Sequence, residues 1–541
     1  MRILTLLIAA ALQAAAPVAG PDVDAMFADW TTATPGCSVG AEVDDQVVLT
    51  KGFGMADLER SIPNRGDTVF EAGSVSKQFT AAAVLLLERD GKLRLDDPIR
   101  RYVPEVPDYG VPVTIRQMLT HTSGLRDWGS VAGIGGWPRT TRVYTHAHVL
   151  DILSRQRALN FDPGTRWSYS NSGYNLAAVL VTRASGMPFA EFTRRRIFEP
   201  LGMSDTSWRD DYTRLVPRRA LAYDRRSDGY HLDMPFENVH GNGGLLTTVG
   251  DLLTWARNFR APIVGDAAFV TAQTTPGRFA DGRVHDYALG VWVDTYRGLR
   301  QIRHSGSTAG YRAYLTTFPD RRATVAVLCN AANADADALA YQVADAALAS
   351  SLTPRSSHRS AHTLTASERN SLAGLYRRTD TGVATRIVSE GETGLRIEGG
   401  AVLYAETGTH LATANGQRWT FEPSGRVRVT DAFGTVDTLI RVEPWTPSPA
   451  ELAALQGTYT SSEAETAFEA VVEGGGLVLE QRPDRVIRLN PAYVDAFSGA
   501  LGAVMFHRDS SGRVTGMSVS QDRVWDLRFE RNDVSVAKPV P

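Results

Sequence analysis

The segment Ser74-Val75-Ser76-Lys77-Gln78-Phe79-Thr80-Ala81-Ala82-Ala83-Val84-Leu85-Leu86-Leu87 places a serine three residues before a lysine, where a run of helix-forming residues begins. This run favours a helix that stops at Gly91. Residues three apart share a helix face, so the Lys77 amine is expected to approach the Ser74 hydroxyl. A serine at a helix start also lies among free backbone N–H groups, which favour a developing negative charge. A buried lysine tends towards its neutral form and can then act as a base, so the segment predicts an activated serine nucleophile.

Taken alone, this spacing more often marks an N-cap serine and a solvated surface lysine. Two further motifs give it weight, Tyr169-Ser170-Asn171 and His304-Ser305-Gly306. A tyrosine could share protons with the serine and the lysine, and the side chain of Asn171 could hydrogen-bond a substrate amide. The third motif is typical of a strand edge whose glycine, Gly306, lets a substrate backbone approach closely. Together the three motifs predict acyl transfer through a serine ester.

In this order, the motifs resemble those of the serine penicillin-recognising superfamily. The similar branch contains class C β-lactamases, D-alanyl-D-alanine carboxypeptidases, D-aminopeptidases and related esterases. The resemblance covers roughly Pro35 to Asn330 and includes the stretches Leu119 to Leu125 and Gly243 to Leu252. An S-x-x-K signature also marks neighbouring classes of this superfamily.

The resemblance implies a role for each matched residue. Ser74 would be the acylated nucleophile, with Lys77 and Tyr169 as the proton-transfer pair. Asn171 and His304 would line the substrate cleft. The backbone N–H groups of Ser74 and Ser307 would form the oxyanion hole, beside the strand residue Gly306.

The β-lactamases usually carry lysine where this chain has His304. Histidine there is more similar to D-aminopeptidase-like and esterase-like members. Since histidine is often neutral at pH 7, this position does not guarantee a fixed positive charge for a substrate carboxylate. His121 and His240 are interpreted as structural residues.

Composition narrows the class of partner. The chain has 541 residues with 57 basic and 60 acidic side chains. This near balance gives no excess of positive charge that would indicate nucleic-acid binding. It contains no His-Glu-x-x-His sequence, no cysteine pair with metal spacing and no Asp-rich calcium loop, so we expect neither a metal nor a cofactor. The expected partner is a small peptide, amide or ester, and the oligomeric state stays open.

The N-terminus predicts export. Residues 1–20 combine a positive charge, a short apolar run and small residues suited to cleavage, as in a secretory signal peptide. No later stretch is long and apolar enough to span a bilayer, so we expect a periplasmic or secreted protein. Export permits a disulfide between Cys37 and Cys329, the two cysteines of the chain, but two buried thiols are the favoured state.

The chain divides into three parts after the signal peptide. Residues 25–352 predict a mixed α/β domain of the β-lactamase-like class, with an antiparallel sheet flanked by helices and a helical subdomain. Residues 366–443 and 449–535 then predict two small all-β, barrel-like units, because Leu372-Ala373-Gly374-Leu375-Tyr376 recurs as Leu455-Gln456-Gly457-Thr458-Tyr459.

Three functions are compatible with these observations. The first is an exported serine hydrolase that cleaves amide or ester bonds through a Ser74 acyl-enzyme, with D-amino-acid-containing peptides as the substrate class that the resemblance implies. The second is an esterase or weak β-lactamase of the same fold, since residues outside the motifs set specificity. The third is a non-catalytic penicillin-binding, wall-binding or sensor protein, which would not need the complete proton-transfer set.

Overall fold

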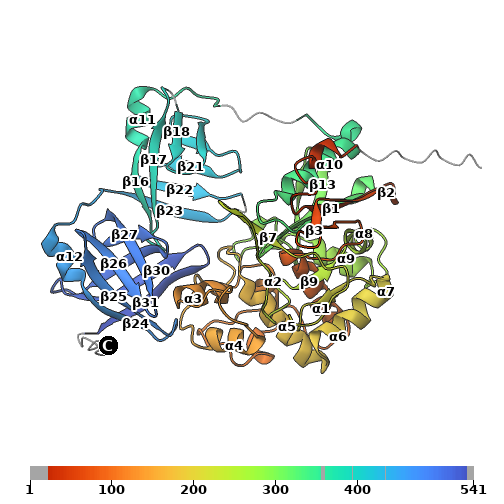
Figure 1. Ribbon diagram of the computed structural model, residues 1–541. Helices are drawn as coiled ribbons and strands as arrows, with labels where there is room; N and C mark the ends of the chain where they lie inside the picture. Colours follow the sequence, from red (N-terminus) through yellow and green to blue (C-terminus); the bar gives the residue numbers. More distant parts are fainter. Residues whose placement is uncertain (1–21, 355–359, 393, 433, 533–541) are drawn as a thin grey trace, which may run out of the picture.

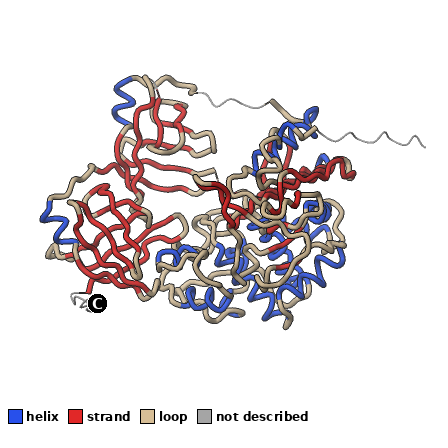
Figure 2. The backbone as a smooth tube through the Cα atoms, viewed as in Figure 1, coloured by secondary structure: helices blue, strands red, loops and turns tan. Residues whose placement is uncertain are grey.

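The computed structural model describes residues 22–354, 360–392, 394–432 and 434–532, as a mixed α/β unit followed by two closed β-barrels (Figures 1 and 2). The predicted fold class is therefore confirmed. The predicted signal peptide lies outside the described residues. Among the helices that are described, none has both the length and the apolar character needed to cross a bilayer.

A six-stranded antiparallel sheet forms the centre of the first unit, in the order β12-β13-β14-β15-β1-β2. Its strands are β1 (Cys37–Val43), β2 (Gln46–Phe53), β12 (Trp292–Tyr296), β13 (Leu299–Thr308), β14 (Tyr311–Phe318) and β15 (Ala323–Cys329). Strands from the beginning and the end of the unit pair inside the sheet, where Val39 of β1 lies opposite Val327 of β15. Every residue of β15 is buried, as expected for a strand covered on both faces.

Helices cover both faces of this sheet. On one face lies α10 (Ala336–Ala347), whose Leu339 and Val343 join the core formed by β1, β14 and β15. On the other lies α8 (Val249–Arg257), which approaches β1 so closely that a Cβ on Gly40 would stand 3.1 Å from Val249. The remaining helices form the subdomain beside the sheet: α1 (Lys77–Arg89), α2 (Ile115–Leu119), α3 (Trp128–Ile134), α4 (His146–Ser154), α5 (Asn171–Ser185), α6 (Phe189–Thr193), α7 (Glu199–Leu201) and α9 (Ala267–Thr274).

Local sequence signals determine where several of these helices begin and end. Thr114 and Gln117 form the capping box that opens α2. The left-handed Gly186 ends α5. Short strand pairs complete the unit: β3 (Met55–Asp57) with β4 (Ile62–Pro63), β5 (Phe70–Glu71) and β6 (Ser207–Trp208) with β9 (Leu245–Thr247), β7 (Tyr223–Arg226) with β8 (Gly229–Leu232), and β10 (Gly277–Arg278) with β11 (Val284–His285).

The two cysteines lie opposite each other on β1 and β15, and the structure joins Cys37 and Cys329 in a disulfide. The favoured expectation of two buried thiols was therefore wrong. Its physical reason is the register, because directly paired residues of adjacent antiparallel strands bring their side chains together. Sequence alone could not specify this register, because the two cysteines are separated by 292 residues.

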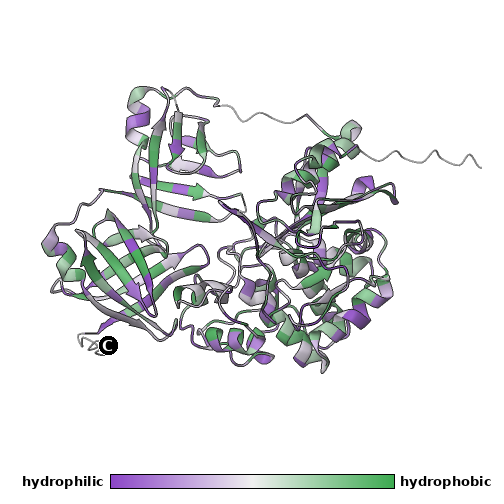
Figure 3. Cartoon of the chain, in the orientation of Figure 1, coloured by the Kyte–Doolittle hydropathy of each residue, from purple (hydrophilic) through white to green (hydrophobic). Residues whose placement is uncertain are grey.

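Each C-terminal unit is an eight-stranded closed barrel preceded by a short helix. The first has α11 (Ala366–Leu372), β16 (Gly374–Arg378), β17 (Ala384–Glu390), β18 (Gly394–Ile397), β19 (Val402–Ala405), β20 (His410–Ala412), β21 (Arg418–Phe421), β22 (Arg426–Thr430) and β23 (Val436–Val442). The second has α12 (Pro449–Leu455), β24 (Gly457–Ser461), β25 (Thr466–Glu473), β26 (Gly476–Gln481), β27 (Arg485–Tyr493), β28 (Ala496–Gly499), β29 (Gly502–Arg508), β30 (Val514–Gln521) and β31 (Val524–Asn532). Hydrophobic and hydrophilic residues mix along the barrel strands, as the alternation of inward and outward side chains requires (Figure 3).

The repeated sequence motif makes the same contact in both barrels. The hydroxyl of Tyr376 donates to the carbonyl of Leu372 at 2.8 Å, and Tyr459 donates to Leu455 at 2.7 Å. The glycine between each pair has a positive φ, 155° at Gly374 and 149° at Gly457, which a side chain would disfavour. The motif therefore joins the helix of each unit to the first strand of its barrel.

Candidate active site

A cavity of about 650 Å³ lies where the α/β unit meets both barrels. The α/β unit supplies Gly73, Ser74, Arg139, Trp167, Ser168, Tyr169, Asn171, Asn242, Gly243, Trp292, His304, Ser305, Ser307 and Thr308. The first barrel adds Arg378, Asp431, Thr435 and Asp437, and the second adds Asp522, Arg523 and Trp525. Six of the seven predicted site residues therefore lie in or at one cavity. Five of them line it, and Lys77 contacts Ser74.

Ser74 and Lys77 are held together at the start of α1. Ser74 belongs to the 3-10 turn Gly73–Ser76, and Lys77 is the first residue of α1. The Lys77 Nζ lies 3.1 Å from the Ser74 Oγ, as the spacing predicted. Ser76 fixes the turn, since its hydroxyl donates to the Gly73 carbonyl at 2.5 Å and accepts from the Leu245 N–H at 3.1 Å.

The partners of the Lys77 amine suit a neutral base. Besides Ser74, Nζ donates to the Asn171 Oδ1 at 2.9 Å and to the Asn242 carbonyl at 2.7 Å. Both are pure acceptors, so they can take the two hydrogens of a neutral amine and leave its lone pair facing the Ser74 hydroxyl. Among the described residues, no carboxylate forms an ion pair with Lys77.

Burial lowers the pKa of Lys77 well below its ordinary value, because the ammonium loses its hydration in the interior. The positive charges of Arg523 and Arg139 lower it further, and the Asp127 carboxylate opposes them. The environment of Lys77 therefore favours the protonation state that can accept a proton from Ser74.

Tyr169 lies on the other side of this pair. Its ring is 4.7 Å from the Lys77 Nζ, and the ring of His121 packs against it at 4.4 Å. Burial raises the pKa of the Tyr169 hydroxyl above its ordinary value, while a hydrogen bond with Ser74 opposes that shift. Tyr169 thus remains a phenol, able to donate a proton, next to an amine that can accept one.

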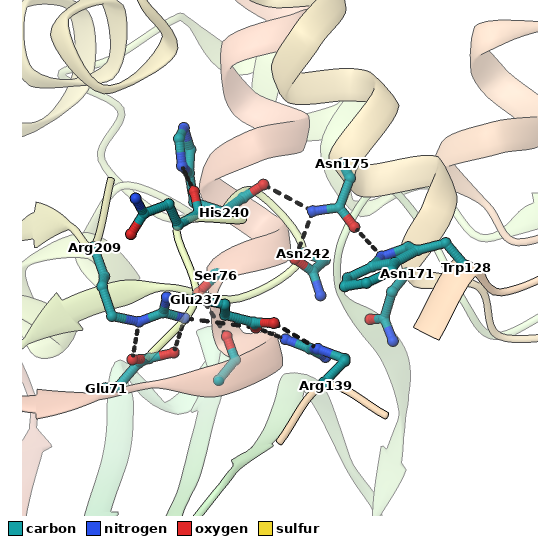
Figure 4. Close-up of polar contacts among 12 residues, drawn as sticks. Glu71, Ser76, Trp128, Arg139, Asn171, Asn175, Arg209, Glu237, His240 and Asn242 are labelled. Carbon is teal, nitrogen blue, oxygen red and sulfur yellow. Dashed lines mark hydrogen bonds and ion pairs between the residues drawn. The ribbon is translucent and has the colours of Figure 1, made fainter. Parts of the chain in front are cut away.

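Asn171 is oriented by buried polar neighbours of α5. Its backbone N–H donates to the Asp127 Oδ2 at 2.8 Å. One turn along, Asn175 donates to the Asn242 Oδ1 at 2.7 Å and accepts from the Trp128 Nε1 at 2.8 Å (Figure 4). These contacts fix the loop whose Asn242 carbonyl accepts from Lys77. Because the Asn171 Oδ1 accepts from Lys77, Asn171 holds the lysine in addition to lining the cavity.

A row of alternating charges, buried except for Arg139, runs from the strand before the nucleophile turn to the cavity wall (Figure 4). Glu71, just before the nucleophile turn, accepts two hydrogen bonds from Arg209, at 2.7 and 3.0 Å. Glu237 lies between Arg209, at 3.7 Å, and Arg139, whose Nε donates to it at 3.0 Å. The adjacent arginines, Arg209 first, hold the pKa of Glu71 below its ordinary value despite its burial. This row fixes the strand that leads into Ser74.

His304 lines the cavity as a neutral side chain. Its Nδ1 lies 2.6 Å from the Ser305 carbonyl, which can only accept, so Nδ1 carries the hydrogen. Nε2 then accepts from the Tyr287 hydroxyl at 3.1 Å. Burial of the ring is the main cause that lowers the pKa of His304 to about 3. His304 therefore supplies no positive charge at neutral pH.

Two glycines allow β13 to pack against the nucleophile turn. A Cβ on Gly306 would stand 2.0 Å from the Ala72 carbonyl oxygen, and one on Gly73 would stand 2.6 Å from the Ser307 nitrogen. Gly306 does not line the cavity, so the close approach that it permits is between two backbone segments of the protein. Ser307 lines the cavity together with Ser74, and the oxyanion hole formed by their backbone N–H groups stays a prediction.

Sequence reasoning missed Asn242, Arg139 and Arg523. Asn242 lies immediately before the Gly243 to Leu252 stretch that resembles the family, but its contribution to Lys77 is a backbone carbonyl, which leaves no signal in residue type. Arg523 comes from the second barrel, and no local motif distinguishes it. Within the described ranges, no group of three histidine, cysteine or acidic residues could hold a metal ion.

Comparisons with known proteins identify the family of the chain. A family model described as Beta-lactamase matches residues 22–348. Penicillin-binding protein 4* of Bacillus subtilis is 31% identical over 313 residues, which cover 54% of this chain and 68% of that protein. A D-aminopeptidase of Gluconobacter oxydans is 28% identical over 458 residues, 82% of this chain and 83% of that protein.

Solved structures have the same fold. The octameric penicillin-binding protein homologue from Pyrococcus abyssi matches with a TM-score of 0.55 at 23% identity, over 75% of this chain and 96% of that one. A D-stereospecific amidohydrolase from Streptomyces matches with a TM-score of 0.51 at 22% identity, over 61% of this chain and all of that one. Since the family model covers more than half of the sequence, the chain belongs to the beta-lactamase family, and it is a serine hydrolase as the motifs predicted.

Proposed function

We propose that this protein hydrolyses amide or ester bonds in D-amino-acid-containing peptides through an acyl-enzyme on Ser74. The observation that carries the proposal is the Lys77 amine, 3.1 Å from the Ser74 hydroxyl, buried and with two acceptors for its own hydrogens. An amine in that position serves to take the hydroxyl proton when the serine is acylated.

The reaction proceeds in two balanced steps. The Ser74 Oγ bonds to the carbonyl carbon of the substrate while its proton passes to Lys77, and the backbone N–H groups of Ser74 and Ser307 stabilise the oxyanion. The carbon–nitrogen or carbon–oxygen bond then breaks, and Tyr169 with Lys77 delivers the proton to the leaving atom. Water attacks the resulting ester, the acid leaves, and Ser74 regains its proton.

The preference for D-amino-acid substrates is supported by the relatives. The Gluconobacter oxydans protein, a D-aminopeptidase, matches across 82% of this chain, a share that extends beyond the catalytic unit. Histidine at position 304 is consistent with this subgroup. The similarity to penicillin-binding protein 4* makes penicillin a reasonable second acylating compound.

Active-site labelling tests the proposal. We expect a fluorophosphonate probe and labelled penicillin to modify Ser74, as located by peptide mass, and D-amino-acid amides or peptides to be turned over. Ser74→Ala should lower turnover by several orders of magnitude while the protein remains folded, because the change removes one oxygen at the cavity wall. Ser154→Ala, an exposed serine of α4, is the control and should behave as wild type.

The outcomes discriminate between the alternatives. Turnover of simple esters alone would indicate the esterase function, and stable penicillin labelling without turnover would indicate a penicillin-binding or sensor protein. Wild-type activity in Ser74→Ala would refute the proposal outright.

Export is a separate part of the proposal and is supported by residues 1–20, which have the charge and apolar pattern of a signal peptide. N-terminal sequencing of protein recovered outside the cytoplasm should begin close to residue 21. An unprocessed N-terminus on cytoplasmic protein would contradict export.

A further inference from the structure

We propose that Arg523, on the turn between β30 and β31 of the second barrel, binds a carboxylate on the leaving group of the substrate. The inference rests on the proposed hydrolytic function and specifies its substrate class, a peptide with a free carboxyl-terminal residue that is released. It assigns to the second barrel the positive charge that His304 does not provide.

Arg523 lies directly at the catalytic residues. It lines the cavity with Ser74 and Tyr169, and its guanidinium carbon is 4.9 Å from the centre of the Tyr169 ring. A guanidinium over an aromatic face keeps its N–H groups at the ring edge free for a planar anion, and a carboxylate matches that fork of donors. The side chain is only partly buried, so a ligand in the cavity can reach it.

The protein backbone holds the turn of Arg523 in place. The Arg523 carbonyl accepts from the Asp127 N–H at 3.1 Å and from the Asn160 Nδ2 at 3.0 Å. The Asn160 Oδ1 in turn accepts from the Trp525 N–H at 2.8 Å. Asp127 also orients Asn171, so the same residue contacts both the Arg523 turn of the second barrel and the start of α5. A charge fixed in this way is ready for a ligand without reordering the turn.

The other two arginines of the cavity are already neutralised. Arg139 is paired with Glu237, and Arg378 contacts Asp380 at 2.7 Å and Asp437 at 3.1 Å. Arg523 forms no ion pair with any residue that the structure describes. An unpaired cation in a cavity that holds 650 Å³ is therefore available for an anion brought by the substrate.

The position over Tyr169 indicates which part of the substrate carries that anion. Tyr169 is the phenol that delivers a proton to the departing atom, so groups next to its ring face the leaving side of the scissile bond. Asp522 on the same turn is exposed and lies at the cavity rim. Arg523, by contrast, is partly buried. The inner position therefore belongs to the cation, and a carboxylate rather than an ammonium is selected there.

A matched pair of substrates tests the proposal. Acetyl-D-alanyl-D-alanine and its carboxyl-terminal amide differ only in the charge that Arg523 would recognise. We expect kcat/KM for the acid to exceed that for the amide, mainly through KM. Arg523→Gln should lower this ratio by about 10-fold or more, the usual effect of losing a charged hydrogen bond. Arg523→Lys should restore part of the ratio, and Arg528→Gln, an exposed arginine of β31 paired with Asp526, should leave it unchanged.

Binding measurements in a Ser74→Ala background keep this test independent of turnover. Calorimetry should then give tighter binding of the acid than of the amide, and Arg523→Gln should remove the difference. Equal affinities for the two peptides, or an equal loss for both in Arg523→Gln, would overturn the carboxylate assignment. So would tight binding of a D-amino-acid amide that Asp522→Asn abolishes, since the turn would then select an ammonium. Failure of the proposed function is seen separately, as undiminished turnover in Ser74→Ala.

Discussion

The two β-barrels share one repeated sequence motif and one closed eight-stranded form, yet they join the catalytic unit in different ways. The core of the second barrel, including Phe468 and Leu527, is continuous with the main core of the α/β unit. The first barrel has a separate core around Trp419 and Leu439. The repeated motif therefore determines the barrel fold, whereas the residues in the loops of each barrel determine what that barrel contributes to a neighbouring site.

The contacts at the two interfaces differ in the same sense. The second barrel places Glu463 on the Arg126 guanidinium at 2.7 Å, and both side chains are almost fully buried. The first barrel places Asp380 and Asp437 on Arg166, at side chains that are about a quarter exposed. A buried charge without its partner is costly, whereas a partly exposed pair is screened by water. The second interface should therefore be the more sensitive to substitution.

The largest effect is expected from Glu463→Gln. The substitution keeps the shape of the side chain but leaves the buried Arg126 without a carboxylate, which should lower the free energy of unfolding by about 3–5 kcal/mol. Urea denaturation followed by fluorescence measures the change. Glu465→Gln is the control. Glu465 is the exposed member of an ion pair with Arg155, so this substitution should change the free energy of unfolding little. If Glu463→Gln lowered the free energy of unfolding no more than the control does, the buried Arg126–Glu463 pair would not make the second interface more sensitive than the first.

A smaller effect is expected from the matching substitution at the first barrel, Asp437→Asn. Asp380 remains in contact with both Arg166 and Arg378, so the loss should be about 1 kcal/mol. The same denaturation experiment checks it, with increasing salt reducing the wild-type advantage. A loss as large as that of Glu463→Gln would remove the distinction between the barrels.

The smallest expected effect is a shift in the pH dependence of activity. The charge of Arg523 lowers the pKa of Lys77, so Arg523→Gln should raise that pKa. Since the neutral amine is the active form, the acidic limb of the kcat/KM profile should then move to higher pH. Arg378→Gln, a cavity arginine of the first barrel that does not act on Lys77, should leave the limb in place. Equal movement in both variants would mean that the cavity responds to its total charge rather than to the second barrel.

Much of the catalytic unit was predictable because its signals are local. The Ser74–Lys77 spacing predicts one helix face, and the capping box of Thr114 and Gln117 predicts the start of α2; both are present in the structure. The family resemblance then brought Tyr169 and His304 to the same cavity. These residues act through their own side chains, so residue type carried the information.

The remainder depends on long-range packing, which leaves no mark in a short window of sequence. Asn242 acts through a carbonyl, and Arg523 reaches the site through anchors on Asp127 and Asn160. The Cys37–Cys329 disulfide depends on strand register in the same way. In each case the sequence indicates where a residue lies in its own segment. It does not indicate which other segment packs against that residue.

The pairing of β1 with β15 has a consequence for how the molecule is made. The adjacent strands β1 and β15 come from opposite ends of the α/β unit, so the sheet cannot be completed until nearly all of the unit has left the ribosome. Long-range strand pairing of this kind is slow compared with local helix formation. Although β1 can pair early with its neighbour β2, the nascent chain should therefore expose the other edge of β1 throughout synthesis, and partners that shield such an edge will find it accessible only before β15 arrives.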